Sequence, residues 1–98
     1  MVQKIWNKIL AKEEVRQNLS KLREIVKDEK NKEICKKIVS ENELVVEQLL
    51  KSEDAKTRKN IALLIGDLQL SVMQMQLWRA YEKEETLFVR SYMHFCLV

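Results

Sequence analysis

Proline is absent from this sequence, glycine occurs only at Gly66, and there are two cysteines and one histidine. Sandwiches and barrels need many turns, and turns depend on glycine and proline, so the scarcity of both argues against closed β folds. Leu, Ile, Val, Lys and Glu dominate instead, which is typical of helices. A chain of 98 residues suits one small domain and is too short for two. We therefore expect residues 1–98 to form a single all-α domain.

Long apolar segments are also missing. No apolar run approaches the roughly 20 residues that a membrane-spanning helix requires. Lys8 and Lys12 interrupt the N-terminal segment, which therefore lacks the apolar core of a signal peptide. These observations favour a soluble, cytoplasmic protein. Cys35 and Cys96 are far apart and no CxxC or Cys/His metal pattern surrounds them. We expect two buried free thiols in preference to a disulfide, and no metal or other cofactor.

Charge is distributed unevenly along the chain. Residues 1–37 carry eleven basic and six acidic side chains, residues 38–71 carry four and six, and residues 72–98 carry three of each. A basic first third can favour an anionic partner, but the interleaved acids are more typical of a solvated helix face, which is the interpretation we prefer. The candidate contacts to an anionic partner are Lys4, Lys8, Lys12, Lys27, Lys30, Lys36 and Lys37.

Apolar residues recur at helical spacing along most of the chain. Ser40 and Glu43 fit a capping box, and Ser52 or Asp54 fits the N-cap of the next helix. Gly66 is expected to stop that helix, because glycine tolerates the left-handed conformation there. A charged turn at 82–85 is expected to be solvated. The helices expected on this basis cover about residues 5–10, 15–27, 31–39, 41–50, 54–68, 71–81 and 86–98.

Three segments of the sequence align on an arginine, at Arg16, Arg58 and Arg90. Each arginine follows a short acidic stretch, and each acidic stretch follows an apolar helix. The interval from Arg58 to Arg90 has the length of a helix-turn-helix repeat. The longer interval from Arg16 to Arg58 is explained if the short helix at 31–39 is an insertion. The acidic stretches are Glu13-Glu14, Glu53-Asp54 and Glu84-Glu85.

The clearest copy of this pattern is the segment 54–68. It has an acidic turn, then a β-branched residue and Arg58, then Asn60, then alternating Leu and Ala ending in Gly66. This order resembles the second-helix signature of HEAT-like repeats. The resemblance implies a right-handed α-solenoid of about three helix pairs. The first copy departs from the pattern at Ser20, and the third departs at Tyr92, which stands where the other copies have asparagine.

The aligned polar residues are expected to be structural. The acid favours the positive N-terminus of the second helix, and the arginine fork can reach an acid or a carbonyl of the adjacent repeat. The asparagine two residues later can bond the turn of a neighbour. These structural positions are Arg16, Asn18, Arg58, Asn60 and Arg90.

A second resemblance concerns the segments 15–23, 54–60 and 80–91. Their amino-acid sequences are similar to the helical N-terminal region of some bacterial RNA methyltransferases. The resemblance implies an accessory RNA-binding segment without the catalytic domain. No glycine-rich turn following a strand is present to bind a methyl donor.

No combination of residues in the sequence indicates a catalytic site. His94 is the only histidine, and Cys96, two residues away, would point to a different helix face. Trp78 is expected in the core, as are the methionines Met73, Met75 and Met93. We therefore expect no enzyme and no small-molecule substrate.

The last apolar helix carries no polar cap. A terminal repeat normally needs one, so either a further repeat follows or the end packs on a second copy through residues 86–98. The candidate interface residues are Trp6, Phe88, Tyr92, Phe95 and Leu97. The sequence thus predicts a non-enzymatic protein-interaction or scaffold module with a protein partner, and as an alternative the RNA-binding segment.

Overall fold

Helices make up the whole regular structure of the computed structural model, which describes residues 1–97 and contains no strand in that part of the chain. The expectation of an all-α fold is confirmed. The elements are α1 (Val2–Leu10), α2 (Val15–Ile25), α3 (Glu29–Ser40), α4 (Glu43–Leu50), α5 (Ala55–Leu68), the 3-10 helix η1 (Ser71–Met73), α6 (Gln74–Lys83) and α7 (Leu87–Cys96).

Local side-chain chemistry explains several helix boundaries. Asp54 is the N-cap of α5, as predicted, and its carboxylate accepts a hydrogen bond from the backbone N–H of Thr57 at 3.0 Å. The prediction for Ser40 was wrong. Ser40 lies in the last turn of α3, and its hydroxyl donates to the carbonyl of Lys36 at 2.6 Å, so α3 continues past the expected cap. Asn42 takes the N-cap position of α4.

Gly66 does not stop a helix, contrary to expectation. It lies inside α5, and the residue in the left-handed region is Gln69, with φ of 52°. Glycine is required at 66 for a different reason. A Cβ atom there would lie 2.8 Å from the Sγ atom of Cys96 in α7, which is closer than the two atoms can approach. Gly66 therefore permits the close packing of α7 on α5.

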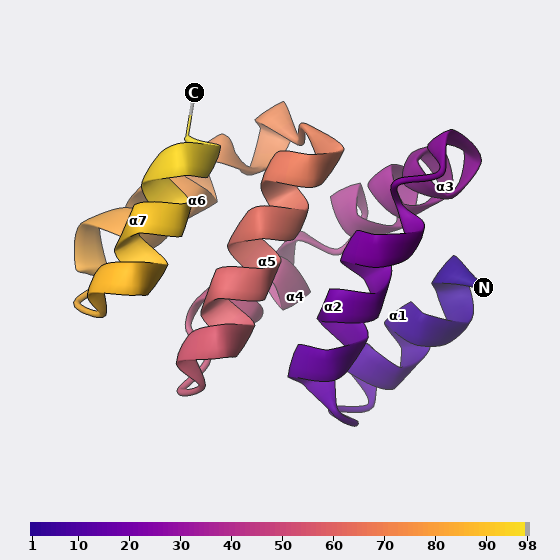
Figure 1. The fold of residues 1–98 in the computed structure, drawn as a ribbon, viewed down its shortest axis with the longest axis horizontal. Helices are drawn as coiled ribbons and strands as arrows, with labels where there is room; N and C mark the ends of the chain where they lie inside the picture. The colour runs from indigo at the N-terminus through magenta and orange to yellow at the C-terminus, as the bar shows by residue number, and fades with distance from the viewer. Residues whose placement is uncertain (98) are drawn as a thin grey trace.

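Three helices lie side by side across the molecule, with α5 between α2 and α7 (Figure 1). Each packs against the helix that precedes it: α1 contacts α2, α4 contacts α5, and α6 contacts α7. In the view of Figure 1, α4 and α6 lie behind this row. α3 is the additional element, packed against α1 near the N-terminal end, and it includes the segment expected as an insertion.

Buried residues occur at the same positions after each of the three aligned arginines, Arg16, Arg58 and Arg90. Three residues after each aligned arginine the side chain is fully buried, at Leu19, Ile61 and Met93. Three residues further on, Leu22, Leu64 and Cys96 are buried as well. Equivalent positions of α2, α5 and α7 therefore face the same interior.

Both tryptophans lie where the sequence did not predict them. Trp6 is 1% exposed and packs in the core with Val2 and Ile9, so it is unavailable as an interface residue, and that prediction is corrected. These three residues share one face of α1, which packs on the neighbouring helices. Trp78, expected in the core, is 48% exposed on α6.

Candidate interaction surface

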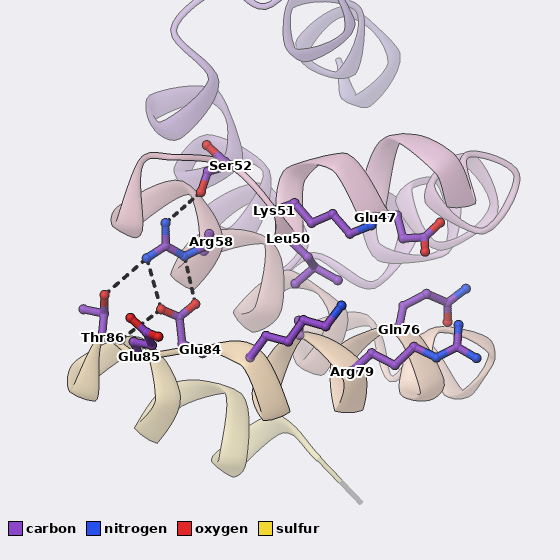
Figure 2. A pocket seen from close by; sticks show the side chains of 12 residues that line it. Glu47, Leu50, Lys51, Ser52, Arg58, Gln76, Arg79, Glu84, Glu85 and Thr86 are labelled. Atoms are coloured by element: carbon purple, nitrogen blue, oxygen red, sulfur yellow. Dashed lines mark hydrogen bonds and ion pairs between the residues drawn. The ribbon is translucent and has the colours of Figure 1, made fainter.

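The boundary between α5 and the turn before α7 is held by one buried ion pair. Arg58 Nε donates to Glu84 Oε1 at 2.8 Å, and Nη2 donates to Oε2 at 3.0 Å (Figure 2). The same guanidinium donates to the carbonyl of Ser52 at 2.7 Å and to the hydroxyl of Thr86 at 3.3 Å. Arg58 thus reaches both a carboxylate and a carbonyl, in the fork geometry that arginine favours.

Glu84 is the polar residue that the sequence reasoning missed. It was expected in a solvated turn, yet its side chain is 5% exposed. Burial raises the pKa of Glu84, but the hydrogen bonds from Arg58 and Thr86 and the charge of Arg58 outweigh that effect, and the pKa lies below its ordinary value. The sequence feature that could have predicted the burial of Glu84 was its place in the acidic stretch before Arg90.

An equivalent but weaker contact joins α2 to the start of α5. Arg16 Nη1 lies 3.7 Å from Asp54 Oδ1, with both side chains nearly half exposed. Asn60 Nδ2 also donates to the carbonyl of Arg16 at 3.1 Å, which ties α5 to the first turn of α2. Asn18 Nδ2 bonds within its own turn instead, donating to the carbonyl of Glu13 at 2.8 Å.

Arg90 has a different environment from the other two arginines. Its Nη1 donates to the carbonyls of Tyr81, at 2.8 Å, and Glu84, at 3.3 Å. Its guanidinium carbon lies 4.1 Å from the centre of the Tyr81 ring, a cation–π contact. Among residues 1–97, no carboxylate forms an ion pair with Arg90.

Two further aromatic rings extend this contact. Trp78 stacks on Tyr81 with ring centres 5.6 Å apart, and His94 lies 5.8 Å from Tyr81 on the other helix. We call Trp78, Tyr81, Arg90 and His94 the end cluster. It lies where α6 meets α7, and Trp78 and His94 are exposed.

A second exposed surface, which is apolar, lies on α7 itself. Phe88, Tyr92 and Phe95 occur at i, i+4 and i+7, so they share one face of the helix. They are 45%, 43% and 83% exposed. We call these three residues the α7 stripe. The Nζ atom of Lys59 lies 5.7 Å from the centre of the Tyr92 ring, so α5 contributes a positive charge at its edge. Leu97, predicted to join this surface, is half-buried and packs against the core.

The candidate contacts to an anionic partner do not share one element. Lys4 and Lys8 lie on α1 and Lys12 follows it. Lys27 lies between α2 and α3 and pairs with Glu24 at 3.1 Å. The other three lysines lie on α3, where Lys36 is half-buried, and are Lys30, Lys36 and Lys37.

An open pocket of about 590 Å³ lies between α4 and α6. The Arg58–Glu84 pair forms one end of it, with Lys51 and Glu47 along the α4 wall and Arg79 on α6 (Figure 2). Basic and acidic side chains both line this pocket, so their charges largely cancel.

Burial also determines the state of the thiols. Both cysteines are free, as predicted. Burial raises the pKa of Cys35 to about 11 and also raises the pKa of Cys96. The thiolate is the reactive form, so both groups are poor nucleophiles near neutral pH. Within residues 1–97, no group of His, Cys, Asp or Glu side chains has the geometry to hold a metal ion.

None of the helices in the described part of the chain has the length and apolarity needed to cross a membrane. Comparisons with protein-family models, with curated proteins and with solved structures found no match to this chain.

Proposed function

We propose that this chain is a non-enzymatic protein-interaction module and that it binds its partner through the α7 stripe. The observation that carries the proposal is the exposure of Phe88, Tyr92 and Phe95 along one face of a helix whose opposite face is buried. Aromatic side chains dominate the energetics of protein interfaces. Soluble proteins rarely expose several large apolar residues together without a binding role.

We also propose that the scaffold is a right-handed α-solenoid of three HEAT-like helix pairs. The row formed by α2, α5 and α7 supports this, as does the shared register of buried residues after each arginine. Each helix pair has an apolar face that it cannot bury alone, so neighbouring pairs stack. A rigid stack holds the α7 stripe in a fixed position, which lowers the entropic cost of binding.

Charge around the α7 stripe indicates the chemistry of the partner. Lys59 contacts the Tyr92 ring, and Lys56 is exposed one turn earlier on α5. The positively charged border favours an apolar segment that also carries acidic side chains. We therefore propose an acidic, apolar protein segment as the ligand of this surface.

Site-specific photo-crosslinking tests this proposal. A photoreactive phenylalanine analogue replaces Phe95 in one variant and Leu44 in another, because Leu44 is also a strongly exposed apolar residue, at 74%, but lies on α4. We expect a protein adduct from position 95 in cells that produce the chain, and much less from position 44. The adduct is expected to weaken when Lys59→Glu reverses the charge beside the stripe. Equal yields at both positions, or no effect of the charge reversal, would overturn the proposal.

The alternative, binding of RNA through the basic first third, is separated by the same experiment. It predicts little adduct from position 95, because α1 and α3 lie at the opposite end of the molecule from α7 (Figure 1), and an affinity for RNA that falls steeply with salt. Its support in the structure comes from the exposed lysines of α1 and α3, which are spread over several elements.

A further inference from the structure

Three aligned arginines and three acidic stretches alternate along the chain, and two of the arginines contact an acid of the next stretch. Arg16 on α2 lies beside Asp54, the N-cap residue of α5. Arg58 on α5 binds Glu84, which lies in the turn before α7. Each of these arginines thus contacts the acid that precedes the second helix of the following pair. Arg90, the third arginine, forms no ion pair within residues 1–97.

Arg90 is anchored in the same way as Arg58, but two of its donor atoms are unused. In both arginines Nη1 donates to the carbonyl six residues earlier, which belongs to Ser52 and to Glu84 respectively. Arg58 uses Nε and Nη2 to bind the two oxygens of a carboxylate. The same two atoms of Arg90 donate to no acceptor in the described part of the chain, and the Tyr81 ring supports the guanidinium group. Because this fork is held before a carboxylate arrives, little side-chain entropy is lost on binding.

The acidic stretch that has no arginine is Glu13-Glu14, in the turn between α1 and α2. Both side chains are exposed, and neither forms an ion pair with another residue among 1–97. Glu14 occupies the N-cap position of α2, as Asp54 does in α5, but its side chain makes no capping hydrogen bond. The turn itself is fixed, because the buried amide of Asn18 donates to the Glu13 carbonyl at 2.8 Å. The two carboxylates are therefore displayed to solvent on a turn of fixed shape.

We infer that copies of this chain associate head to tail, with Arg90 of one copy binding the Glu13-Glu14 turn of the next. This contact repeats between copies the arginine–carboxylate contact that already joins α5 to the turn before α7. The turns before α2, α5 and α7 lie along the same edge of the molecule, and α1 and α7 lie at opposite ends (Figure 1). A second copy stacked on the α7 end in the same orientation therefore places its Glu13-Glu14 turn on the edge where α7 begins.

The charges of the two ends favour this orientation. Residues 1–37 carry eleven basic and six acidic side chains, and Lys4 and Lys8 are exposed on α1. At the other end, Glu82 is exposed on α6, one turn from Trp78, and no ion pair involves it in the part of the chain that the structure describes. A head-to-tail contact brings this acid toward basic side chains, whereas contact between two α1 ends brings like charges together.

Exposed apolar side chains outside the α7 stripe lie at both ends. Met75 and Trp78, three residues apart on α6, are 60% and 48% exposed. At the N-terminal end Met1 is 77% exposed, and Ile5, four residues later, is half-buried. Arg90 lies on nearly the opposite side of α7 from the α7 stripe, because residues two positions apart differ by about 200° around a helix. The head-to-tail contact therefore uses a different surface and goes beyond the proposed function.

Sedimentation of the chain at rising concentration tests the inference. A contact between two different ends leaves one end of each copy free, so we expect the average mass of the wild-type chain to rise past that of a dimer. Arg90→Glu, and the double variant Glu13→Gln with Glu14→Gln, are each expected to need at least ten-fold higher concentration to associate. A matched control, Glu41→Gln with Glu43→Gln, removes the same charge from two exposed acids at the start of α4 and is expected to associate like wild type.

Mixing Arg90→Glu with the Glu13/Glu14 double variant tests the direction of the contact. Only one kind of junction in this mixture joins an intact Arg90 to intact acids, so an equimolar mixture is expected to stop at a dimer with one copy of each variant. A face that pairs with itself would lose both copies of the contact in Arg90→Glu and would give no mixed dimer.

The two variants also guard against a folding defect. Arg90 contacts two carbonyls, so the folding of Arg90→Glu is checked by circular dichroism, and the Glu13/Glu14 variant, which changes only exposed side chains, decides the question if Arg90→Glu does not fold. A wild-type chain that stays monomeric at all concentrations would overturn the inference. So would a Glu13/Glu14 variant that associates like wild type, or a mixture of folded variants that stays monomeric or grows past the dimer. Crosslinking from Phe95 to a different protein is read separately, so either proposal can fail while the other holds.

Discussion

Arg58 and Glu84 form a bidentate ion pair between α5 and the turn before α7, with both hydrogen bonds at or below 3.0 Å and the carboxylate almost fully buried. The pair lies between residues 26 positions apart in the sequence. It fixes α7 relative to α5, and so fixes the orientation of the α7 stripe. The end cluster is adjacent, since Arg90 contacts the carbonyl of Glu84.

Loss of the Glu84 charge is expected to be strongly destabilising. Glu84→Gln leaves the Arg58 guanidinium buried without its counter-charge, and removing one partner of a buried pair costs about 3 kcal/mol of the free energy of unfolding. The neighbouring exposed residue provides a matched control, because Glu85→Gln is expected to change stability by less than about 0.5 kcal/mol. Urea unfolding followed by circular dichroism measures both. Equal effects of the two substitutions would show that the pair contributes little.

Stability is expected to fall in acid because of the same carboxyl. The pKa of Glu84 lies below its ordinary value of 4.5, so the unfolded chain takes up the proton more readily than the folded chain. The stabilisation is therefore complete above about pH 5 and is lost as pH falls through the folded-state pKa. We expect the urea midpoint to fall between about pH 5 and pH 3, and to fall less in Glu84→Gln. If Glu84→Gln kept the wild-type pH dependence, the loss of stability in acid would come from other titratable groups.

Asp54 is expected to act mainly as a helix cap. Its hydrogen bond with the Thr57 side chain is the largest influence lowering the pKa of Asp54. The Arg16 contact is long and exposed, so it contributes at most about 1 kcal/mol. Asp54→Ala is expected to cost about 1 kcal/mol. Asp54→Asn should cost much less, because asparagine caps helices well, and thermal unfolding distinguishes the two. If Asn were as damaging as Ala, the charge would matter more than the cap.

Packing of α7 on α5 is tested at Gly66. Alanine in a helix interior is normally favourable by about 1 kcal/mol, but here its Cβ collides with Cys96, and overpacking costs about 1–3 kcal/mol. We expect Gly66→Ala to be destabilising by itself and largely rescued when combined with Cys96→Ala. Chemical unfolding of both single variants and the double variant measures this coupling. A stabilised Gly66→Ala protein would contradict the close contact.

The helices could be predicted from the sequence, because helical periodicity and capping are local properties. The burial of Glu84 could not be predicted, since the choice between neighbouring acids depends on the path of the turn. Gly66 was assigned to a helix end because its real constraint comes from Cys96, thirty residues later. The two tryptophans were misplaced for a similar reason, because spacing defines a helix face but does not say which neighbour covers it.

The central structural claim is that an arginine of one helix pair binds the carboxylate before the second helix of the next pair. A double-mutant cycle on Arg58→Met and Glu84→Gln measures that contact most directly. The account predicts a coupling free energy between about 1 and 3 kcal/mol, with the double variant more stable than the sum of the two single effects implies. Strictly additive effects would contradict it, because they would mean that the two side chains do not interact in the folded chain.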